Sequence, residues 1–537
     1  MSKESGSSAT RSLALSFYTF LSRILGLFRD HYMAVTFGSG WVASAFSIAY
    51  RLPNMYRNLL AEGTLSQSFM PIYNDAEKES AEEAAKVAGT ILTFLFAMLS
   101  IFVAVFILLA PYLLPFLVGG TEEYQKLVIR LSLILFVLIM TASLSSIYIA
   151  IENVHHEYFV PSLSPIVLNL SYLFMFLFVL PSEEDMLEKI ELLCFGIVGG
   201  GVLQLILQIG YVRKMGFSPK LNFNWRHSSI KKIFNLMLPA VIGGGFYQIS
   251  LLFDIFLANY IQNKNPGLDA VVSLDYSQRL IQFPTGIIGV ALATTTLPTL
   301  LSALKKDDRN SISPELVNVI SFGIFLTFPA AIGFLIMGTS IIDSIFYGGK
   351  WTHTSTETTY GALRFYAMAI PLYSINKILT SSYYAFKDTR TPFKINMISF
   401  SINIIMNLIF MTFLKHMGLA LASAISSAIT CTLLFSLLKK HEIIIPVKIL
   451  VKRISGFIPS LLFLSLVLVI FEFILKSSFF EYFSESGWAH ASISRVFIAL
   501  GISCSGIVYF IISYLMKVQE FDIIFGKITS KINRRKK

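Results

Sequence analysis

The chain has 537 residues, of which 55% are hydrophobic and 14% are charged, and its formal net charge is +11. Soluble proteins usually contain about a quarter charged residues, so this composition excludes a soluble globular enzyme, a disordered chain and a nucleic-acid-binding protein. In a membrane protein, a positive net charge is first expected in the cytoplasmic loops, because Lys and Arg resist translocation.

Long apolar runs recur along the whole chain. A helix needs about 20 mostly apolar residues to cross a bilayer, and these runs lack the sustained alternation that would indicate membrane strands. The fourteen predicted spans are residues 12–33, 41–60, 88–110, 127–150, 158–180, 190–212, 231–261, 271–303, 316–345, 358–386, 392–413, 418–438, 454–475 and 492–516. The sequence therefore predicts an all-α polytopic membrane protein with 14 transmembrane helices.

Lys and Arg are distributed unequally between the loops on the two sides of the membrane. With the N-terminus in the cytoplasm, the cytoplasmic segments contain 28 of these residues and the outer loops contain 6. This asymmetry follows the positive-inside rule and predicts an even number of spans, with both termini in the cytoplasm. The first apolar segment contains Arg23, Arg29 and Asp30, which do not suit a cleavable signal, so we expect it to remain as the first helix.

Two sequence patterns occur twice at nearly the same interval. Arg51-Leu52 and Arg279-Leu280 each begin a stretch that ends in a proline, 20 and 19 residues later, and their offset is 228 residues. Residues 146–150 resemble residues 381–385 at an offset of 235 residues. Both intervals span six helices, and an even number of helices preserves the orientation of a repeat in the membrane.

These repeats predict two pseudo-symmetric six-helix lobes, residues 1–230 and 231–440. Residues 441–537 then hold helices 13 and 14 and a basic C-terminal tail.

Arginines occur inside several of the predicted spans. Charged residues in membrane helices are costly and usually face a bundle interior or a water-filled cavity. For Arg23, Arg51 and Arg279 we favour a role in a cavity. For Arg57 the alternative of snorkelling to the cytoplasmic surface, or of structural pairing, stays equally open.

The acidic residues in or near the predicted spans are too few to neutralise all of these arginines. Arg29 has candidate partners in Asp30 and Glu62. The acids in or near the predicted spans are Asp30, Asp254, Asp275, Asp343 and Glu472, and the last three lie toward the outer ends of their spans. The planar guanidinium fork suits phosphate oxygens. The sequence therefore predicts a cationic cavity for a large anionic substrate, a phosphate or pyrophosphate, at membrane depth.

A second polar group could bind Na⁺ or H⁺. It consists of Asp254 in the seventh predicted helix and Asn376 with Lys377 in the tenth, although an ion pair between Asp254 and Lys377 is an equally good interpretation. The three Cys and eight His lack metal-ligand spacing, and no enzymatic or P-loop motif is present, so we expect neither a metal nor a cofactor. Transport would then depend on an ion gradient or the membrane potential.

Several motifs together resemble one known family. The motifs are Ser22-Arg23-x-Leu25-Gly26-x-x-Arg29-Asp30, Leu52-Pro53-Asn54-x-x-Arg57, Ala61-Glu62-Gly63-x-x-Ser66-x-x-Phe69-x-Pro71, Arg279-Leu280-x-x-Phe283-Pro284-x-Gly286-x-x-Gly289-Val290-Ala291-Leu292 and Lys387-Asp388-Thr389-x-Thr391-Pro392. They resemble the signature of the MurJ (MviN) family, the lipid II flippases of bacterial peptidoglycan synthesis in the MOP exporter superfamily. The resemblance covers most of the chain.

This resemblance implies fourteen helices and a V-shaped cavity between two lobes. It implies alternating access that moves lipid II, the undecaprenyl-pyrophosphate-linked muropeptide, from the inner to the outer leaflet of the cytoplasmic membrane. Helices 13 and 14 would form a groove for the lipid tail. The residues expected at the substrate site are Ser22, Arg23, Arg29, Asp30, Arg51, Arg57, Glu62 and Arg279, and those of the candidate ion site are Asp254, Asn376 and Thr380.

Three positions depart from what some family members carry. Ser44, Gln282 and Thr380 stand where those members have acidic residues, which argues against a proton relay at the first two positions and against Na⁺ at the third. The alternatives are a flippase for another polyprenyl-pyrophosphate-linked oligosaccharide, a cation-drug antiporter of the same superfamily, or a non-transporting cell-wall scaffold. Expected partners are lipid II, membrane lipids and cell-wall synthesis proteins.

Overall fold

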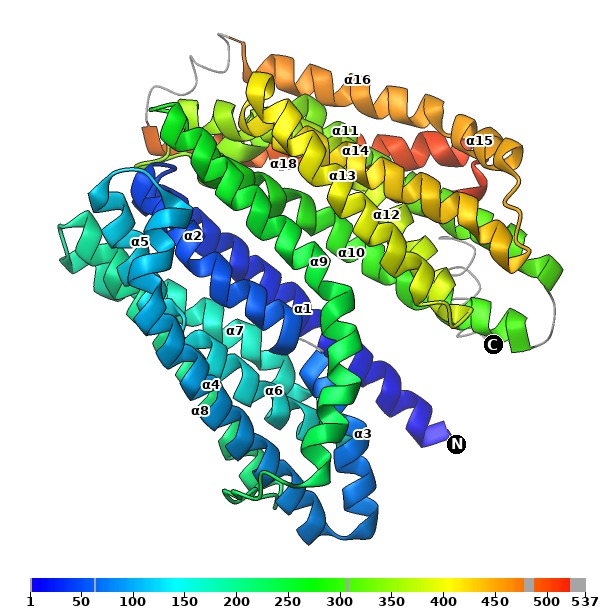
Figure 1. Ribbon diagram of the computed structural model, residues 1–537. Coiled ribbons are helices and arrows are strands. Elements are labelled where there is room, and N and C mark those ends of the chain that lie inside the picture. Colours follow the sequence, from blue (N-terminus) through cyan, green and yellow to red (C-terminus); the bar gives the residue numbers. More distant parts are fainter. Residues whose placement is uncertain (1, 62–63, 306–308, 478–486, 522–537) are drawn as a thin grey trace. The chain divides into compact units, whose positions relative to one another are not determined.

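The structure is a computed structural model that describes residues 2–61, 64–305, 309–477 and 487–521 (Figure 1). The described residues are mainly helical and contain no strand beyond an isolated bridge between Gly348 and Trp351. The all-α class predicted from the sequence is therefore confirmed.

Nine helical segments in the described part of the chain are long and apolar enough to cross a membrane. They are Ala81–Val118, Glu122–Val154, Phe159–Ser182, Met186–Lys214, Ile312–Phe346, Arg390–Leu414, His416–His441, Val447–Leu475 and Ile493–Leu515. The chain is thus a multi-pass membrane protein. The remaining five predicted spans fall on helices outside this set, so the total of fourteen spans stays a prediction.

The chain divides into two compact units. Unit 1 is residues 1–272 with 348–351, and unit 2 is residues 273–347 with 352–537. The helices of unit 1 are α1 (Ser2–Phe37), α2 (Trp41–Tyr56), the π-helix η1 (Arg57–Ala61), α3 (Thr64–Glu79), α4 (Ala81–Val118), α5 (Glu122–Leu135), α6 (Leu138–Val154), α7 (Phe159–Phe174), the π-helix η2 (Met175–Val179), the 3-10 helix η3 (Leu180–Ser182), α8 (Met186–Lys214) and α9 (Ser228–Lys264).

The helices of unit 2 follow in chain order. They are α10 (Ala270–Lys305), which begins within the last residues of unit 1, α11 (Arg309–Phe346), α12 (His353–Ala385), α13 (Arg390–Leu414), α14 (His416–Leu437), the 3-10 helix η4 (Leu438–His441), α15 (Val447–Gly456), α16 (Ile458–Leu475) and α18 (Gly487–Leu515). Helix α9 belongs to unit 1 by its contacts, although the sequence repeats assign residues 231–264 to the second predicted lobe. The units and the predicted lobes are defined by different criteria. The lobe boundaries at residues 230 and 440 therefore remain predictions.

Polar side chains mark where several helices begin. Ser80, Thr121 and Asp185 precede α4, α5 and α8, and each accepts a hydrogen bond from a backbone N–H of the first turn. Thr352 begins α12 with a reciprocal capping box to Ser355. Such caps satisfy backbone donors that a helix end leaves without a partner, so these loop residues fix the helix boundaries.

The core of unit 1 lies among α3, α4 and α6. Phe69 and Tyr73 of α3, Leu99 of α4, and Ile147 and Ile151 of α6 are almost completely buried there. Helix α3 was not among the predicted spans because half of its surface is polar. It packs its apolar face against this core.

The segment between α8 and α9 crosses α4 at Gly89. A Cβ atom at that position would overlap the carbonyl oxygen of Lys220. Next to it, the backbone N–H of Asn222 donates to Oγ1 of Thr93 at 3.0 Å. Glycine is therefore required at this crossing.

The core of unit 2 joins α11 to the last helices of the chain. The Tyr509 hydroxyl of α18 donates to the Phe325 carbonyl oxygen of α11 at 2.8 Å, and the two rings lie 4.9 Å apart. Phe457, just before α16, packs edge-on against Phe325. The two C-terminal helices thus belong to the same packed unit as α11.

Candidate substrate-binding site

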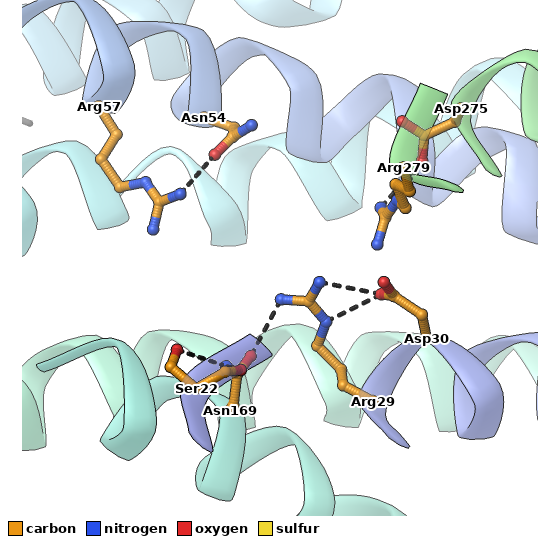
Figure 2. A network of polar contacts seen from close by, with 8 residues as sticks. All are labelled: Ser22, Arg29, Asp30, Asn54, Arg57, Asn169, Asp275 and Arg279. Carbon is orange, nitrogen blue, oxygen red and sulfur yellow. Dashed lines mark hydrogen bonds and ion pairs between the residues drawn. The ribbon is translucent and has the colours of Figure 1, made fainter. Parts of the chain in front are cut away.

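One face of α1 presents Ser22, Gly26 and Arg29 to α7. These residues are spaced by four and three positions, which places them on the same side of a helix. Across from them, Nδ2 of Asn169 on α7 donates to the Ser22 carbonyl oxygen at 3.0 Å and to the Ser22 hydroxyl at 3.4 Å. Figure 2 shows the side chains of Ser22 and Asn169 facing each other. A Cβ atom at Gly26 would lie 3.8 Å from that same nitrogen. The two helices therefore meet at Asn169.

The guanidinium of Arg29 is fixed by three neighbours. Its Nη1 donates to Oδ1 of Asn169 at 3.1 Å, while Nε and Nη2 donate to Oδ1 of Asp30 at 3.0 and 2.9 Å (Figure 2). Its central carbon lies 5.2 Å from the centre of the Tyr172 ring, within the range of a cation–π interaction. The side chain of Arg29 is 21% exposed. The group is thus held in one orientation and remains partly accessible.

Arg57 lies where the geometry of the second helix changes. Its Nη2 donates to Oδ1 of Asn54 at 2.9 Å, and the π-helix η1 begins at Arg57 itself. Pro53, inside α2, is buried and lacks the backbone N–H of a regular helix. π-Turns often mark functional sites. Arg57 is half-buried, and this degree of burial is compatible both with a role in a cavity and with snorkelling.

The other expected residues of unit 1 make fewer described contacts. Arg23 on α1 is half-buried, and within the described part of the chain its side chain makes no hydrogen bond or ion pair. Arg51 on α2 is also half-buried. Glu62 lies outside the described residues, so its proposed pairing with Arg29 stays untested.

In unit 2, Arg279 on α10 is arranged much as Arg29 is in unit 1. Its Nε and Nη2 donate to Oδ2 of Asp275 at 3.1 and 2.9 Å. Its central carbon lies 5.5 Å from the centre of the Tyr276 ring. In each unit, one arginine therefore pairs with a carboxylate and lies over an aromatic face.

The expectation that acidic residues are too few to neutralise these arginines is wrong for Arg29 and Arg279. Asp275 stands four positions before Arg279, so both lie on the same helix face, and Asp30 adjoins Arg29 directly. Each pair carries no net charge. A guanidinium has five N–H groups, so one carboxylate partner does not by itself prevent a phosphate contact.

The structure shows the burial of two residues that depart from the family pattern, Ser44 and Gln282. Ser44 is completely buried on α2, and Nε2 of Gln262 on α9 donates to its hydroxyl at 3.0 Å. Gln282 is exposed on α10. The absence of a proton relay at these two positions stays a prediction.

The candidate ion-site residues are divided between the units. Asp254 is buried on α9 in unit 1. In unit 2, Nδ2 of Asn376 donates to the Ser427 hydroxyl at 2.9 Å, and Thr380 is half-buried on the same helix. The ion site and the alternative pair of Asp254 with Lys377 both stay predictions.

The sequence analysis did not assign Asn169 or Tyr172 to the site. They stand three positions apart within the apolar span 158–180, which places them on one face of α7. Polar residues that share a helix face inside a predicted span were the available signal. Asn54 belonged to a quoted motif, but no role was given to it.

The fold is shared with solved structures of membrane transporters. A solved structure of a lipid II flippase MurJ is 24% identical with a TM-score of 0.71, over 93% of this chain and 99% of that one. A multidrug resistance MATE family transporter of the MOP superfamily is 13% identical with a TM-score of 0.67, over 78% of this chain and 94% of that one.

The family model described as lipid II flippase MurJ matches residues 33–486, and the chain belongs to this family. A probable lipid II flippase MurJ of Rickettsia prowazekii (strain Madrid E) is 29% identical over 515 residues, which are 95% of this chain and 98% of that protein. A probable lipid II flippase MurJ of Haemophilus influenzae (strain ATCC 51907 / DSM 11121 / KW20 / Rd) is 31% identical over 445 residues, 79% of this chain and 85% of that protein.

Proposed function

We propose that the chain flips lipid II from the inner to the outer leaflet of the cytoplasmic membrane. The match of the lipid II flippase family model over residues 33–486 carries this proposal. The protein acts as a transporter and forms no covalent bond with its substrate. Both termini lie in the cytoplasm, in accordance with the distribution of Lys and Arg between the loops.

The arginines of both units are proposed to bind the pyrophosphate during alternating access. A diphosphate cannot enter hydrocarbon without compensation of its charge, and guanidinium groups offer paired N–H donors to its oxygens. Arg29 supports this role because Asn169, Asp30 and Tyr172 fix its orientation before substrate arrives. A fixed guanidinium loses less side-chain entropy on binding than a mobile one.

The membrane potential is proposed to drive the outward movement of the anionic head. An inside-negative potential favours this movement by about 2.3 kcal/mol per charge per 100 mV. The membrane potential acts on the return of the empty protein only through the net charge of the moving part of the protein. The pairs of Arg29 with Asp30 and of Arg279 with Asp275 contribute little net charge, whereas Arg23 on α1 would contribute to the charge that returns the empty protein.

A depletion and complementation experiment tests the proposed function. The chain is expressed in a bacterium whose own lipid II flippase is depleted, and growth and the leaflet distribution of lipid II are measured. We expect growth to be restored and lipid II to reach the outer leaflet. Continued accumulation in the inner leaflet, with the chain present in the membrane, would contradict the proposal.

Substitutions distinguish transport from a scaffold role. Arg23→Ala and Arg279→Ala should abolish complementation while the protein still inserts at normal levels. Arg130→Ala is the matched control, because Arg130 is 63% exposed and pairs with Glu191 outside the proposed site. A non-transporting scaffold would tolerate all three substitutions.

A further inference from the structure

Unit 1 contains a buried carboxyl group that the proposed function does not use. Glu152, near the end of α6, is 0% exposed. Within the described residues, no Lys, Arg or His side chain forms an ion pair with it. A buried carboxylate without a cation is costly, so such a group is held by hydrogen bonds or is neutral.

The amide of Gln208 on α8 occupies the space between Glu152 and Ser164 of α7. One terminal atom of this amide lies 2.6 and 2.8 Å from the two carboxyl oxygens of Glu152. The other lies 2.6 Å from Oγ of Ser164. Gln208 is 1% exposed and Ser164 is 6% exposed. All three side chains are therefore locked in one buried chain of hydrogen bonds.

The two orientations of this amide correspond to two protonation states. If Glu152 is ionised, it can only accept, so the Gln208 nitrogen must face it and the amide oxygen accepts from Ser164. If Glu152 is protonated, it donates to the amide oxygen, and the amide nitrogen donates to the Ser164 hydroxyl. Both arrangements keep the contacts of the Gln208 amide with Glu152 and Ser164 at the same atomic positions, so the site accommodates the carboxyl group with or without its proton.

A cavity of about 410 Å³ between α7 and α8 borders this chain of hydrogen bonds. Ser164 and Gln208 lie in its wall, together with Tyr211 and Lys214. The polar side chains in the wall can hold water in an otherwise apolar space. Gln208 and Ser164 therefore connect Glu152 to the wall of this cavity.

Charged and titratable groups lie on several of the elements that pack against α6. Tyr211 of α8 donates to the exposed Glu157 at 3.1 Å, and Glu157 is the acid that acts on Glu152 by charge. From α3, Glu77 pairs with His155 at 3.3 Å. Other charged groups on the elements packed against α6 are Arg51 on α2, Arg57 on η1, Asp75, Lys78 and Glu79 on α3, Glu82, Glu83 and Lys86 on α4, and Glu188, Lys189, Glu191, Arg213 and Lys214 on α8.

We propose that Glu152 is a reversible proton-binding site in unit 1, with Gln208 turning its amide as the proton binds and leaves. The carboxylate takes a proton from water in the cavity to give the neutral acid and releases it by the reverse reaction. A link between this site and transport rests on the proposed function, whereas proton binding itself does not.

Infrared difference spectroscopy of the full chain in lipid nanodiscs tests the site, over the pH range in which the protein stays folded. We expect a carboxyl band that appears reversibly on acidification, is absent from Glu152→Gln, and persists in the control Glu157→Gln. Identical pH-dependent spectra for the wild type and Glu152→Gln would overturn the proposal. Neither outcome depends on whether the protein flips lipid II.

A second measurement needs no variant. Dicyclohexylcarbodiimide reacts with protonated carboxyl groups in apolar surroundings, and peptide mass mapping locates the adduct. We expect labelling at Glu152 in the wild type that falls several-fold as the pH is raised. Labelling that does not change with pH, or no labelling at any pH, would overturn the proposal.

Discussion

Arg29 and Asn169 are 140 positions apart in the sequence, yet Nη1 of Arg29 on α1 donates to Oδ1 of Asn169 on α7 at 3.1 Å. The same amide donates through Nδ2 to the Ser22 carbonyl oxygen two turns earlier on α1. One side chain thus fixes both the position of α1 against α7 and the direction of the Arg29 guanidinium. We interpret Asn169 as a positioning residue for substrate binding.

Asn169→Leu should therefore impair flipping without preventing insertion. Leucine has a similar size but can neither accept from Arg29 nor donate to Ser22, and each lost hydrogen bond costs about 0.5–1.5 kcal/mol. Flipping of lipid II in proteoliposomes and the Tm in detergent are the measurements. Leu170→Ala is the control, because Leu170 is 49% exposed on the same helix. Equal flipping by both variants would refute the positioning role.

Arg29→Lys should lose most of the activity although the positive charge remains. Lysine has one compact ammonium group and cannot reproduce the donations of Nε and Nη2 to Asp30 together with that of Nη1 to Asn169. With about 1.5–3 kcal/mol for a hydrogen bond to a charged group, we expect at least a roughly tenfold loss of flipping rate. A lysine variant with the wild-type rate would show that charge alone suffices.

Gly89→Ala should destabilise unit 1. The new methyl group would overlap the Lys220 carbonyl oxygen, and such overpacking costs about 1–3 kcal/mol. Gly199→Ala on α8 is the matched control, since nothing lies within 4 Å of its Cβ position and alanine favours a helix. The Tm should fall only for Gly89→Ala. A similar Tm for both variants would contradict the close crossing at α4.

Asp388 joins the loop before α13 to the 3-10 helix η4, which follows α14. Its carboxylate accepts from the Thr391 hydroxyl at 2.6 Å and from the Thr391 backbone N–H at 3.0 Å, and it lies 3.0 Å from Nε2 of His441. Burial alone would raise its pKa, but these hydrogen bonds and the charge of Lys440 outweigh burial and hold the pKa of Asp388 below its usual range.

A carboxyl group with a lowered pKa stabilises the folded state above its unfolded pKa of about 3.9, and this contribution is lost as the pH falls further. Asp388→Asn should therefore lower the Tm at neutral pH, because the free energy of unfolding falls by about 1.5–3 kcal/mol. The difference from the wild type should shrink below about pH 4. Asp75→Asn, at a carboxylate that is 76% exposed, is the control. A constant difference at all pH values would argue against this assignment.

The sequence predicted the helical class and most helices because apolar length alone identifies them. It did not predict α3, whose polar face conceals it, or the break that divides residues 122–154 into α5 and α6 at Phe136–Val137. Both features depend on packing against neighbouring helices. A hydropathy pattern likewise does not predict the π-helix that follows Tyr56.

The arginines of the candidate site were predictable because a charge in an apolar run is conspicuous. Their partners were predictable only in part. The spacing of Asp275 and Arg279 is local and could have been recognised in the sequence, whereas the contact of Arg29 with Asn169 requires α1 and α7 to pack together. Contacts over such sequence separations do not follow from periodicity.

The binding of lipid II to the purified full chain tests the central claim most directly. The dissociation constant is measured for the wild type, Arg29→Ala, Arg279→Ala and the exposed control Arg130→Ala. If the arginines bind the pyrophosphate, the first two variants should bind at least about tenfold more weakly and the control should match the wild type. Equal dissociation constants for all four proteins would contradict the account.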